Sequence, residues 1–294
     1  MKGQPLTLAL QAPIEAALAR LRAGCGAQCL SEWSFSNLYL FRAAHGYRYL
    51  PGDWPAISGR GYDGARHLLP LFEPARAPLD ALLALLDGHE HLYPLNQRQA
   101  DALGPARFAV SQSRDDADYL YAAASFANYP GRLLAKKRNQ WRQFIEACPG
   151  SVARPYGPAL EAVARQVLAG WMAQKGKGSG EADEGPCLEA LARAGELGLE
   201  GFVHFDGARP IGFVLGQMLE PGVCAIRFAK GLDSHAGLYP HMFRHFSREF
   251  EAHFGRPVAW FNFEQDMGIA GFRRSKMSYR PAALLAKLRV AWRG

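Results

Sequence analysis

The sequence has few cysteines and lacks the spacings that build common cysteine sites. Five cysteines occur among 294 residues, and no C-x-x-C pair is present. A scattered, odd set indicates neither a disulfide framework nor a zinc knuckle. We therefore expect reduced thiols and no bound metal. The cysteines are Cys25, Cys29, Cys148, Cys187 and Cys224.

Long apolar runs are also missing from the sequence. No stretch approaches the roughly 20 apolar residues that a membrane-spanning helix needs. The amino-terminal apolar run is interrupted by Gln11, Pro13 and Glu15, so it matches a signal peptide poorly. We expect a cytoplasmic protein, with peripheral contact to a membrane left open.

Common catalytic and metal-binding motifs are absent as well. No G-x-S-x-G elbow, P-loop or strand-following G-x-G-x-x-G occurs. His241 and His245 have i, i+4 spacing. No glutamate follows His241 and no third ligand is evident, so core or surface histidines are the better interpretation than a metal site.

The composition is that of a globular protein with a basic surface. Apolar residues make up 49% of the chain, charged residues 21%, and the formal net charge is +7. The length suits one large domain or two ordinary ones. The positive charge favours anionic partners such as nucleic acid, an acidic membrane surface or a phosphorylated ligand.

The pattern from residue 151 onward predicts an ordered series of elements. It reads helix, helix, hairpin, strand, helix, strand, helix, with the Gly-, Lys- and Glu-rich segment 175–186 as a mobile loop. That is the order of a GCN5-related N-acetyltransferase (GNAT) core, an α/β fold whose central strands splay apart to admit an acyl donor. We predict two GNAT-like domains with mixed central sheets, 1–150 and 151–294.

The segment VAWFNFEQD (258–266) changes from apolar to acidic along its length. As a strand with period two, it places Asn262, Glu264 and Asp266 on one face. A carboxylate in a partly apolar site has a raised pKa and suits proton abstraction from an amine or hydroxyl. Glu264 is the better candidate base, because Asp266 competes as a helix cap. The alternative is a capped helix beside a surface carboxylate and a satisfied turn amide.

Two basic helices are predicted, one before the acidic segment 258–266 and one directly after it. In the helix 268–280, Arg273, Lys276 and Arg280 fall on one face, and with the helix amino terminus they could hold a phosphate. In the helix 129–150, like charges recur at i, i+4, which costs a few tenths of a kcal/mol per pair and suggests an anionic partner. Trp141 is available there for stacking. A solvated cationic face is the alternative for both helices. The cations of the second helix are Arg132, Lys136, Lys137, Arg138 and Arg142.

The segment AKGLDSHAGLYPHM (229–242) occupies the place where a GNAT cradles the pyrophosphate of coenzyme A. It lacks the usual arginine-rich, glycine-spaced pattern, which counts against an ordinary acetyl-CoA enzyme. Arg227 and Lys230 in the preceding strand are further candidate phosphate ligands.

Three segments carry a family resemblance: SEWSFSNLYLFR, GRLLAKKRNQWRQF and NFEQDMGIAGFRRSKMSYRP. Together they resemble bacterial proteins related to the carboxy-terminal domain of phosphatidylglycerol lysyltransferase, over nearly the whole chain. The resemblance implies tandem GNAT-like domains, and relatives that transfer an amino acid from aminoacyl-tRNA to an acceptor, often a lipid headgroup. It marks Lys136, Lys137, Arg138, Asn139, Asn262, Glu264, Asp266, Gly268, Gly271, Arg273, Lys276, Ser278, Tyr279 and Pro281.

These observations lead to one main functional expectation and two alternatives. The main one is an aminoacyltransferase that uses aminoacyl-tRNA and no cofactor, because the charged tRNA already carries an activated ester. Its acceptor is an amine or hydroxyl on a lipid headgroup, a peptide or a small molecule. The alternatives are a coenzyme A-dependent N-acyltransferase and a non-catalytic binding module. The expected catalytic residues are Glu264, Asp266 and Asn262, and the expected substrate ligands are Arg273, Arg274, Lys276, Tyr279, Lys136, Lys137, Arg138, Asn139, Arg227 and Lys230.

Overall fold

The computed structural model describes residues 3–294; Met1 and Lys2, the start of the predicted first domain, lie outside the described residues. The chain forms two compact units. Among the described residues, the first contains 3–118, Gln265–Arg273 and Leu284–Gly294, and the second contains Tyr119–Glu264 and Arg274–Ala283. The sequence predicts a boundary at residue 150, but the structure divides the chain after residue 118. The difference arises because the basic helix before residue 150 buries Phe144 in the second unit.

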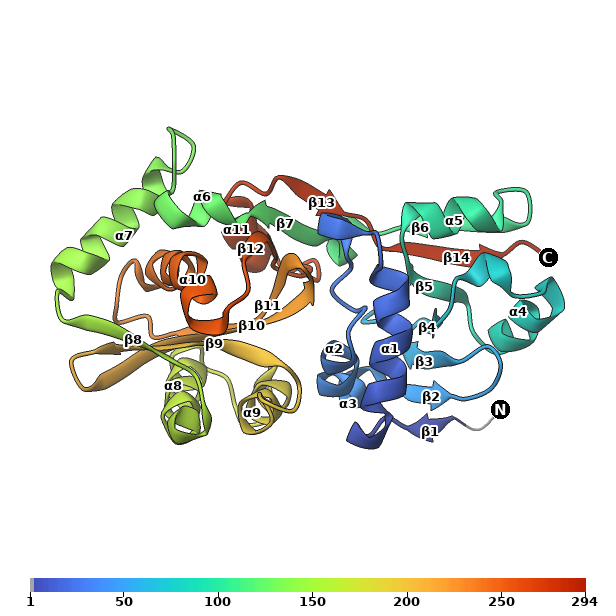
Figure 1. Ribbon diagram of the computed structural model, residues 1–294, viewed down its shortest axis with the longest axis horizontal. Coiled ribbons are helices and arrows are strands. Elements are labelled where there is room, and N and C mark those ends of the chain that lie inside the picture. Colours follow the sequence, from blue (N-terminus) through green and yellow to red (C-terminus); the bar gives the residue numbers. More distant parts are fainter. Residues whose placement is uncertain (1–2) are drawn as a thin grey trace. The chain divides into compact units, whose positions relative to one another are not determined.

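The first unit is built on a seven-stranded mixed sheet (Figure 1). Its strands are, in spatial order, β1 (Gln4–Pro5), β2 (Arg48–Leu50), β3 (Ala56–Arg60), β4 (Arg66–Pro70), β5 (His91–Leu95), β14 (Leu288–Trp292) and β6 (Phe108–Gln112). Its helices are α1 (Gln11–Arg22), α2 (Phe35–Leu40), α3 (Arg42–His45), α4 (Leu79–Leu86) and α5 (Gln97–Leu103).

The second sheet also has seven strands. In spatial order they are β13 (Ala283–Leu285), β7 (Asp118–Ala122), β12 (Val258–Asn262), β11 (Gly222–Gly231), β10 (Arg209–Glu220), β9 (Leu199–Asp206) and β8 (Ser151–Pro155). The remaining helices are α6 (Ala123–Asn128), α7 (Ala135–Ala147), α8 (Glu161–Gln174), α9 (Glu184–Ala192), α10 (Leu238–Phe254) and α11 (Ala270–Met277). The predicted order from the helix α8 to the helix α11 is confirmed, and the prediction lacked three strands: β8 before this series, and β13 and β14 after it.

The two sheets share one pairing pattern. In the first sheet β1 to β4 pair antiparallel in chain order, β4 and β5 pair parallel, and β5 pairs antiparallel with β14. In the second sheet β8 to β11 pair antiparallel in chain order, β11 and β12 pair parallel, and β12 pairs antiparallel with β7. The parallel pairs are β4–β5 and β11–β12. This common pattern is the structural repeat of a tandem fold, although no repeat is visible in the residues.

The central strands of the second sheet separate part-way along their length. β11 and β12 pair from Gly222 with Val258 to Ala225 with Asn262, with one register shift between Gly222 and Val223. β12 then ends, whereas β11 continues to Gly231 while paired with β10. Beyond Ala225 the edge of β11 that faced β12 is therefore no longer paired with that strand, at the place where a GNAT core has its splayed strands.

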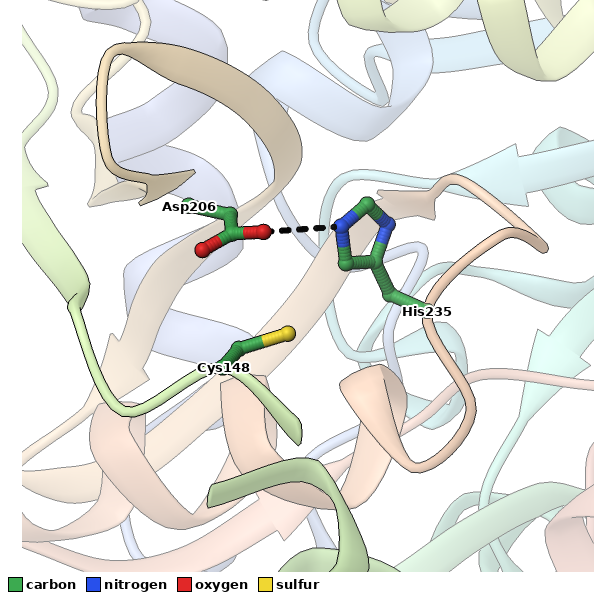
Figure 2. Close-up of side chains that lie close together, drawn as sticks. All are labelled: Cys148, Asp206 and His235. Carbon is green, nitrogen blue, oxygen red and sulfur yellow. Dashed lines mark ion pairs between the residues drawn. The ribbon is translucent and has the colours of Figure 1, made fainter. Parts of the chain in front are cut away.

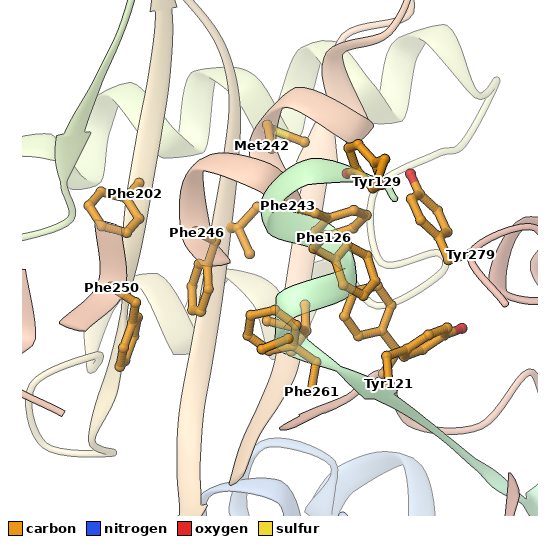
Figure 3. Close-up of a cluster of buried hydrophobic side chains, with 14 of the residues drawn as sticks. Tyr121, Phe126, Tyr129, Phe202, Met242, Phe243, Phe246, Phe250, Phe261 and Tyr279 are labelled. Atoms are coloured by element: carbon orange, nitrogen blue, oxygen red, sulfur yellow. The ribbon is translucent and has the colours of Figure 1, made fainter. Parts of the chain in front are cut away.

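An aromatic core covers one side of this second sheet. Helix α10 contributes Met242, Phe243, Phe246 and Phe250, whose spacing places them on one face of the helix (Figure 3). They pack with aromatic residues of α6, β7 and β12, among which Phe126 is fully buried. Burying side chains of this size stabilises the unit by about 1.5–3 kcal/mol each. Within residues 3–294, no helix combines the length and apolar character needed to cross a bilayer.

A buried ion-pair cluster joins distant segments of the first unit. The ammonium of Lys287 lies 2.6 Å from both the Glu32 and the Asp118 carboxylates. Lys287 and Asp118 are fully buried. Burial alone would lower the pKa of Lys287, but the two carboxylates outweigh it and raise that pKa above its ordinary value.

Replacing Lys287 with Met should therefore destabilise the protein strongly. The substitution leaves two carboxylates together in the interior, a defect that costs about 3–5 kcal/mol. Urea unfolding followed by circular dichroism measures the loss. The matched control is Lys175→Met, because the Lys175–Asp233 pair is exposed and an exposed pair contributes about 0–1 kcal/mol. Equal losses in the two variants would contradict the prediction.

Candidate functional site

The polar end of β12 does not continue the strand. Asn262 is fully buried, and its side-chain oxygen accepts a hydrogen bond of 2.8 Å from the backbone N–H of Glu264. Glu264 has a φ of 56°, in the left-handed region. The turn breaks the period-two alternation, so the prediction of a strand face shared by Asn262, Glu264 and Asp266 was wrong.

Glu264 forms an ion pair with a buried arginine on the neighbouring strand. The side chain of Arg227 is fully buried, and its guanidinium donates to the Glu264 carboxylate. It also donates to the Gln217 side-chain oxygen over 2.9 and 3.2 Å. Since Ala225 is the last residue of β11 that pairs with β12, the ion pair lies where the two strands separate. The paired side chains of Arg227 and Glu264 therefore connect β11 to the segment that follows β12.

Asp266 is fully buried and held by three donors. Its carboxylate accepts from Arg114 over 3.2 Å, from Arg273 over 2.9 Å and from the Gly268 backbone over 2.9 Å. Arg273 also contacts Asp115 over 2.5 Å. Hydrogen bonds to Asp266 and then Asp115 raise the pKa of Arg273 above its ordinary value. The guanidinium predicted to hold a phosphate is thus already balanced by two carboxylates.

The other cations of the predicted helix 268–280 divide between interior and surface, and Arg280 lies outside α11, which ends at Met277. The Lys276 ammonium donates to the backbone carbonyls of Phe263 and Glu264 over 2.5 and 3.2 Å. Arg274 and Arg280 are exposed. The predicted single cationic face through Arg273, Lys276 and Arg280 is therefore not found, because the first two side chains serve partners within the fold.

Two further predicted ligands also have internal partners. Lys230 is buried, donates to Asp183 over 2.6 Å and lies 3.9 Å from the centre of the Trp171 ring. Arg138 donates to the backbone carbonyls of Tyr129 and Gly131 over 2.5 and 3.1 Å. These contacts give both side chains a structural role.

Helix α7 presents fewer free cations than its sequence suggests. It begins at Ala135, so Arg132 precedes it and the predicted helical pair with Lys136 does not form. Trp141, predicted to be available for stacking, is covered by the Arg244 guanidinium at 4.0 Å from its ring centre. Lys136, Asn139 and Arg142 are exposed.

A cavity of about 270 Å³ lies within the second unit, where α7 meets the start of α10. The loop between β11 and α10 forms one side of the cavity. Of the predicted ligands, Lys137 and Tyr279 are brought together here. The remaining lining residues are Gln140, Leu232, Asp233, His235, Ala236, Gly237, Leu238, Tyr239, Pro240 and Ser275.

Lys137 is a cavity-lining lysine whose pKa is lowered. Its ammonium lies 3.9 Å from the centre of the Tyr279 ring. Burial, aided by repulsion from Lys136, lowers the pKa of Lys137 from 10.5 to about 8. This amine therefore loses its proton at a lower pH than an ordinary lysine does.

The start of helix α10 is covered by protein. Gly237 has a φ of 82°, and a Cβ at this position would lie 2.0 Å from the backbone carbonyl oxygen of Gln140. Helix α7 thus occupies the place where the pyrophosphate of coenzyme A is expected.

Sequence reasoning did not select Gln140, His235 or Tyr239 as site residues, although they line the cavity. The signal for two of them was present, since His235 and Tyr239 lie in the segment 229–242 that was singled out as atypical. Gln140 had no signal, because its part in the cavity depends on the packing of α7 on α10.

Replacing Asp266 with Asn should lower the thermal unfolding midpoint by several degrees. The variant leaves Arg114 and Arg273 without the buried carboxylate that balances them. Differential scanning calorimetry measures the change, and the control Arg274→Ala should unfold at the wild-type temperature because its side chain is exposed. An unchanged midpoint in Asp266→Asn would favour a catalytic role for the carboxylate over this structural one.

Comparisons with known proteins agree with this architecture. A sequence profile described as phosphatidylglycerol lysyltransferase, C-terminal, matches residues 27–290. No curated protein matches the chain. Among solved structures, a conserved protein of unknown function from Bacteroides thetaiotaomicron is 22% identical, with full coverage of both chains and a TM-score of 0.81.

Two solved structures with related names are also similar. The C-terminal domain of a protein from Agrobacterium fabrum described as a lysylphosphatidylglycerol synthetase is 12% identical, with a TM-score of 0.63 and coverage of 98% of this chain and 93% of that one. L-PGS from Bacillus licheniformis is 13% identical, with a TM-score of 0.58 and coverage of 87% and 90%. At these identities the structures establish the α/β, tandem GNAT-like fold alone. The profile match over most of the chain establishes that it belongs to the phosphatidylglycerol lysyltransferase C-terminal family, a family of transferases.

Proposed function

We propose that this protein is an aminoacyltransferase that moves an amino acid from an aminoacyl-tRNA to an amine or hydroxyl acceptor. Membership in a family named for a lysyltransferase supports transfer of an aminoacyl group. The observation that carries the proposal is the cavity in which the low-pKa amine of Lys137 faces a space of about 270 Å³. This volume is near the lower end of the about 300–1,000 Å³ typical of ligand pockets, and it suits an amino acid or a small acceptor group.

The chemistry needs a positioned base and little else. The acceptor nitrogen or oxygen attacks the ester carbonyl of the charged tRNA, and its proton passes to the neutral amine of Lys137. The ester bond to the ribose oxygen then breaks, and that oxygen takes a proton as it leaves. Because the ester is already activated, general base catalysis and orientation supply the rate enhancement.

Lys137 is a better candidate base than the carboxylates predicted from the sequence. Asp266 is buried among three donors, and Glu264 is paired with the buried Arg227. Taking up a proton would cost either carboxylate its ion pair. By contrast, the Lys137 amine lies over the ring of Tyr279, a neighbour that attracts its protonated form and forms no ion pair that proton uptake would break.

The surface beside the cavity supports an RNA donor. Lys136 and Arg142 on α7 are exposed, as is Arg248 on α10, which packs against α7. Exposed cations beside a catalytic pocket can follow a phosphate backbone, and such binding weakens steeply as salt rises. Lys136 would therefore bind RNA, and Lys137 would accept the proton.

A coenzyme A-dependent reaction fits the second unit less well. The separation between β11 and β12 is bridged by Arg227 and Glu264, and the start of α10 is covered by Gln140. Both places that a GNAT fold uses for its acyl donor are thus filled by the protein itself.

Transfer from charged tRNA tests the proposal directly. The full-length protein, incubated with a pool of radiolabelled aminoacyl-tRNAs and a cell extract, should move label into a new product. Lys137→Met should reduce this transfer by about 10²–10⁴-fold, the usual contribution of a general base, while remaining folded. Transfer that needs acyl-CoA instead of charged tRNA, or no transfer with any charged tRNA, would overturn the proposal.

The pH dependence of transfer tests the role of Lys137. The rate should rise with pH and level off above about 8, because the neutral amine is the active form. Lys136→Gln removes a neighbouring positive charge that lowers the pKa of Lys137, so the midpoint of the profile should move to higher pH. Arg142→Gln is the matched control, expected to weaken RNA binding without moving the midpoint. A midpoint unaffected by Lys136→Gln would assign the ionisation to the acceptor.

A further inference from the structure

We propose that Cys148, Asp206 and His235 form a binding site for a divalent transition-metal ion of the Zn²⁺ type. The three residues come from different parts of the second unit. Cys148 follows α7, Asp206 ends β9, and His235 lies in the loop before α10 (Figure 2). Their potential ligand atoms, one from each side chain, all lie within 4.8 Å of one another.

The chemistry of the three groups suits zinc. A thiolate, an imidazole nitrogen and a carboxylate oxygen are the ligand types that bind Zn²⁺ in proteins. The His235 Nε2 lies 3.4 Å from the Asp206 carboxylate oxygen. Two ligands bonded to one tetrahedral zinc ion at about 2.0–2.1 Å lie about 3.3 Å apart. The pair is therefore spaced as two ligands of one ion would be.

The surroundings of His235 also match a metal ligand. Its second ring nitrogen, Nδ1, lies 3.0 Å from the Ser234 hydroxyl. When Nδ1–H donates to this hydroxyl, Nε2 is left unprotonated and able to coordinate, as is usual for metal-bound histidines. The ring is oriented toward Asp206, and Cys148 projects into the same space (Figure 2).

Exposure differs among the three ligands in a way that leaves room for a fourth. Cys148 is buried, and the His235 side chain is 9% exposed, whereas the Asp206 side chain is 40% exposed. Water can therefore complete a tetrahedral shell from the Asp206 side.

The site would control the loop that lines the cavity. A bound ion would tie His235 in that loop to the end of α7 and to the turn after β9. His235 also lines the cavity itself. Metal binding should therefore order one wall of the cavity. The metal proposal does not depend on which reaction the cavity supports.

Cobalt titration of the chelator-treated, full-length protein tests the proposal. We expect one Co²⁺ per chain with micromolar affinity or better, and a near-ultraviolet thiolate-to-cobalt charge-transfer band. Cys148→Ser should abolish the band, and Ser234→Ala should weaken binding by about 10–100-fold, as for other outer-shell partners. The matched control is Cys187→Ser, a buried thiol of the same unit that should retain the band.

The outcomes decide between a metal site and a chance cluster. Asp206→Asn guards against a folding defect in the cysteine variant, because its side chain is partly exposed; it should keep the wild-type fold and lose affinity. Added Zn²⁺ should raise the thermal unfolding midpoint of the wild type but not of this variant. Absence of Co²⁺ binding at micromolar concentration, or binding that survives both Cys148→Ser and Asp206→Asn, would overturn the proposal.

Discussion

The ion pair between Arg227 and Glu264 is the contact on which the candidate site depends. A buried guanidinium is stable only when its donors are satisfied, and here Gln217 and Glu264 share that task. Meeting Arg227 places Glu264 just beyond the end of β12, in a left-handed turn that Asn262 stabilises. The turn directs the chain away from the sheet and toward α11. Lys276 on α11 then donates back to the turn carbonyls, which closes the arrangement.

Because this ion pair bridges β11 and the end of β12, the open space of the second unit lies elsewhere, beside α7. In a GNAT fold the separated central strands and the start of the following helix receive the acyl donor. Here side chains bridge the strands, and the carbonyl of Gln140 lies against Gly237 at the start of the helix. The space that remains lies between α7, the loop before α10, and Tyr279. A ligand there meets the side chains of α7, including Lys137, which a donor in the strand opening would not do.

The sequence predicted the helices and strands after residue 151 because each carries its own periodicity of apolar residues. It could not predict which charges are free. Arg273 and Asp115 are 158 residues apart in the chain, yet they form an ion pair in the first unit. At the strand end the alternative of a satisfied turn amide was the correct one for Asn262, whose side chain bonds the Glu264 backbone, but the partner of the Glu264 carboxylate on β11 could not be read from the sequence. The cluster of Cys148, Asp206 and His235 carries no local motif either, because each ligand comes from a different element.

Lys137 shows how position on a helix separates two chemically identical neighbours. Successive residues on a helix point about 100° apart, so Lys136 faces solvent while Lys137 turns toward the cavity. Desolvation and the adjacent charge of Lys136 then disfavour the protonated form of Lys137. The two effects act together only because the lysines are adjacent. A lysine at position 136 alone would be an exposed cation, and a lysine at position 137 alone would be a half-buried amine. With both present, the exposed charge of Lys136 lowers the pKa of Lys137. An anion bound at Lys136 would screen its charge and raise the pKa of Lys137, so under the proposed function binding of the tRNA phosphates would make Lys137 more basic.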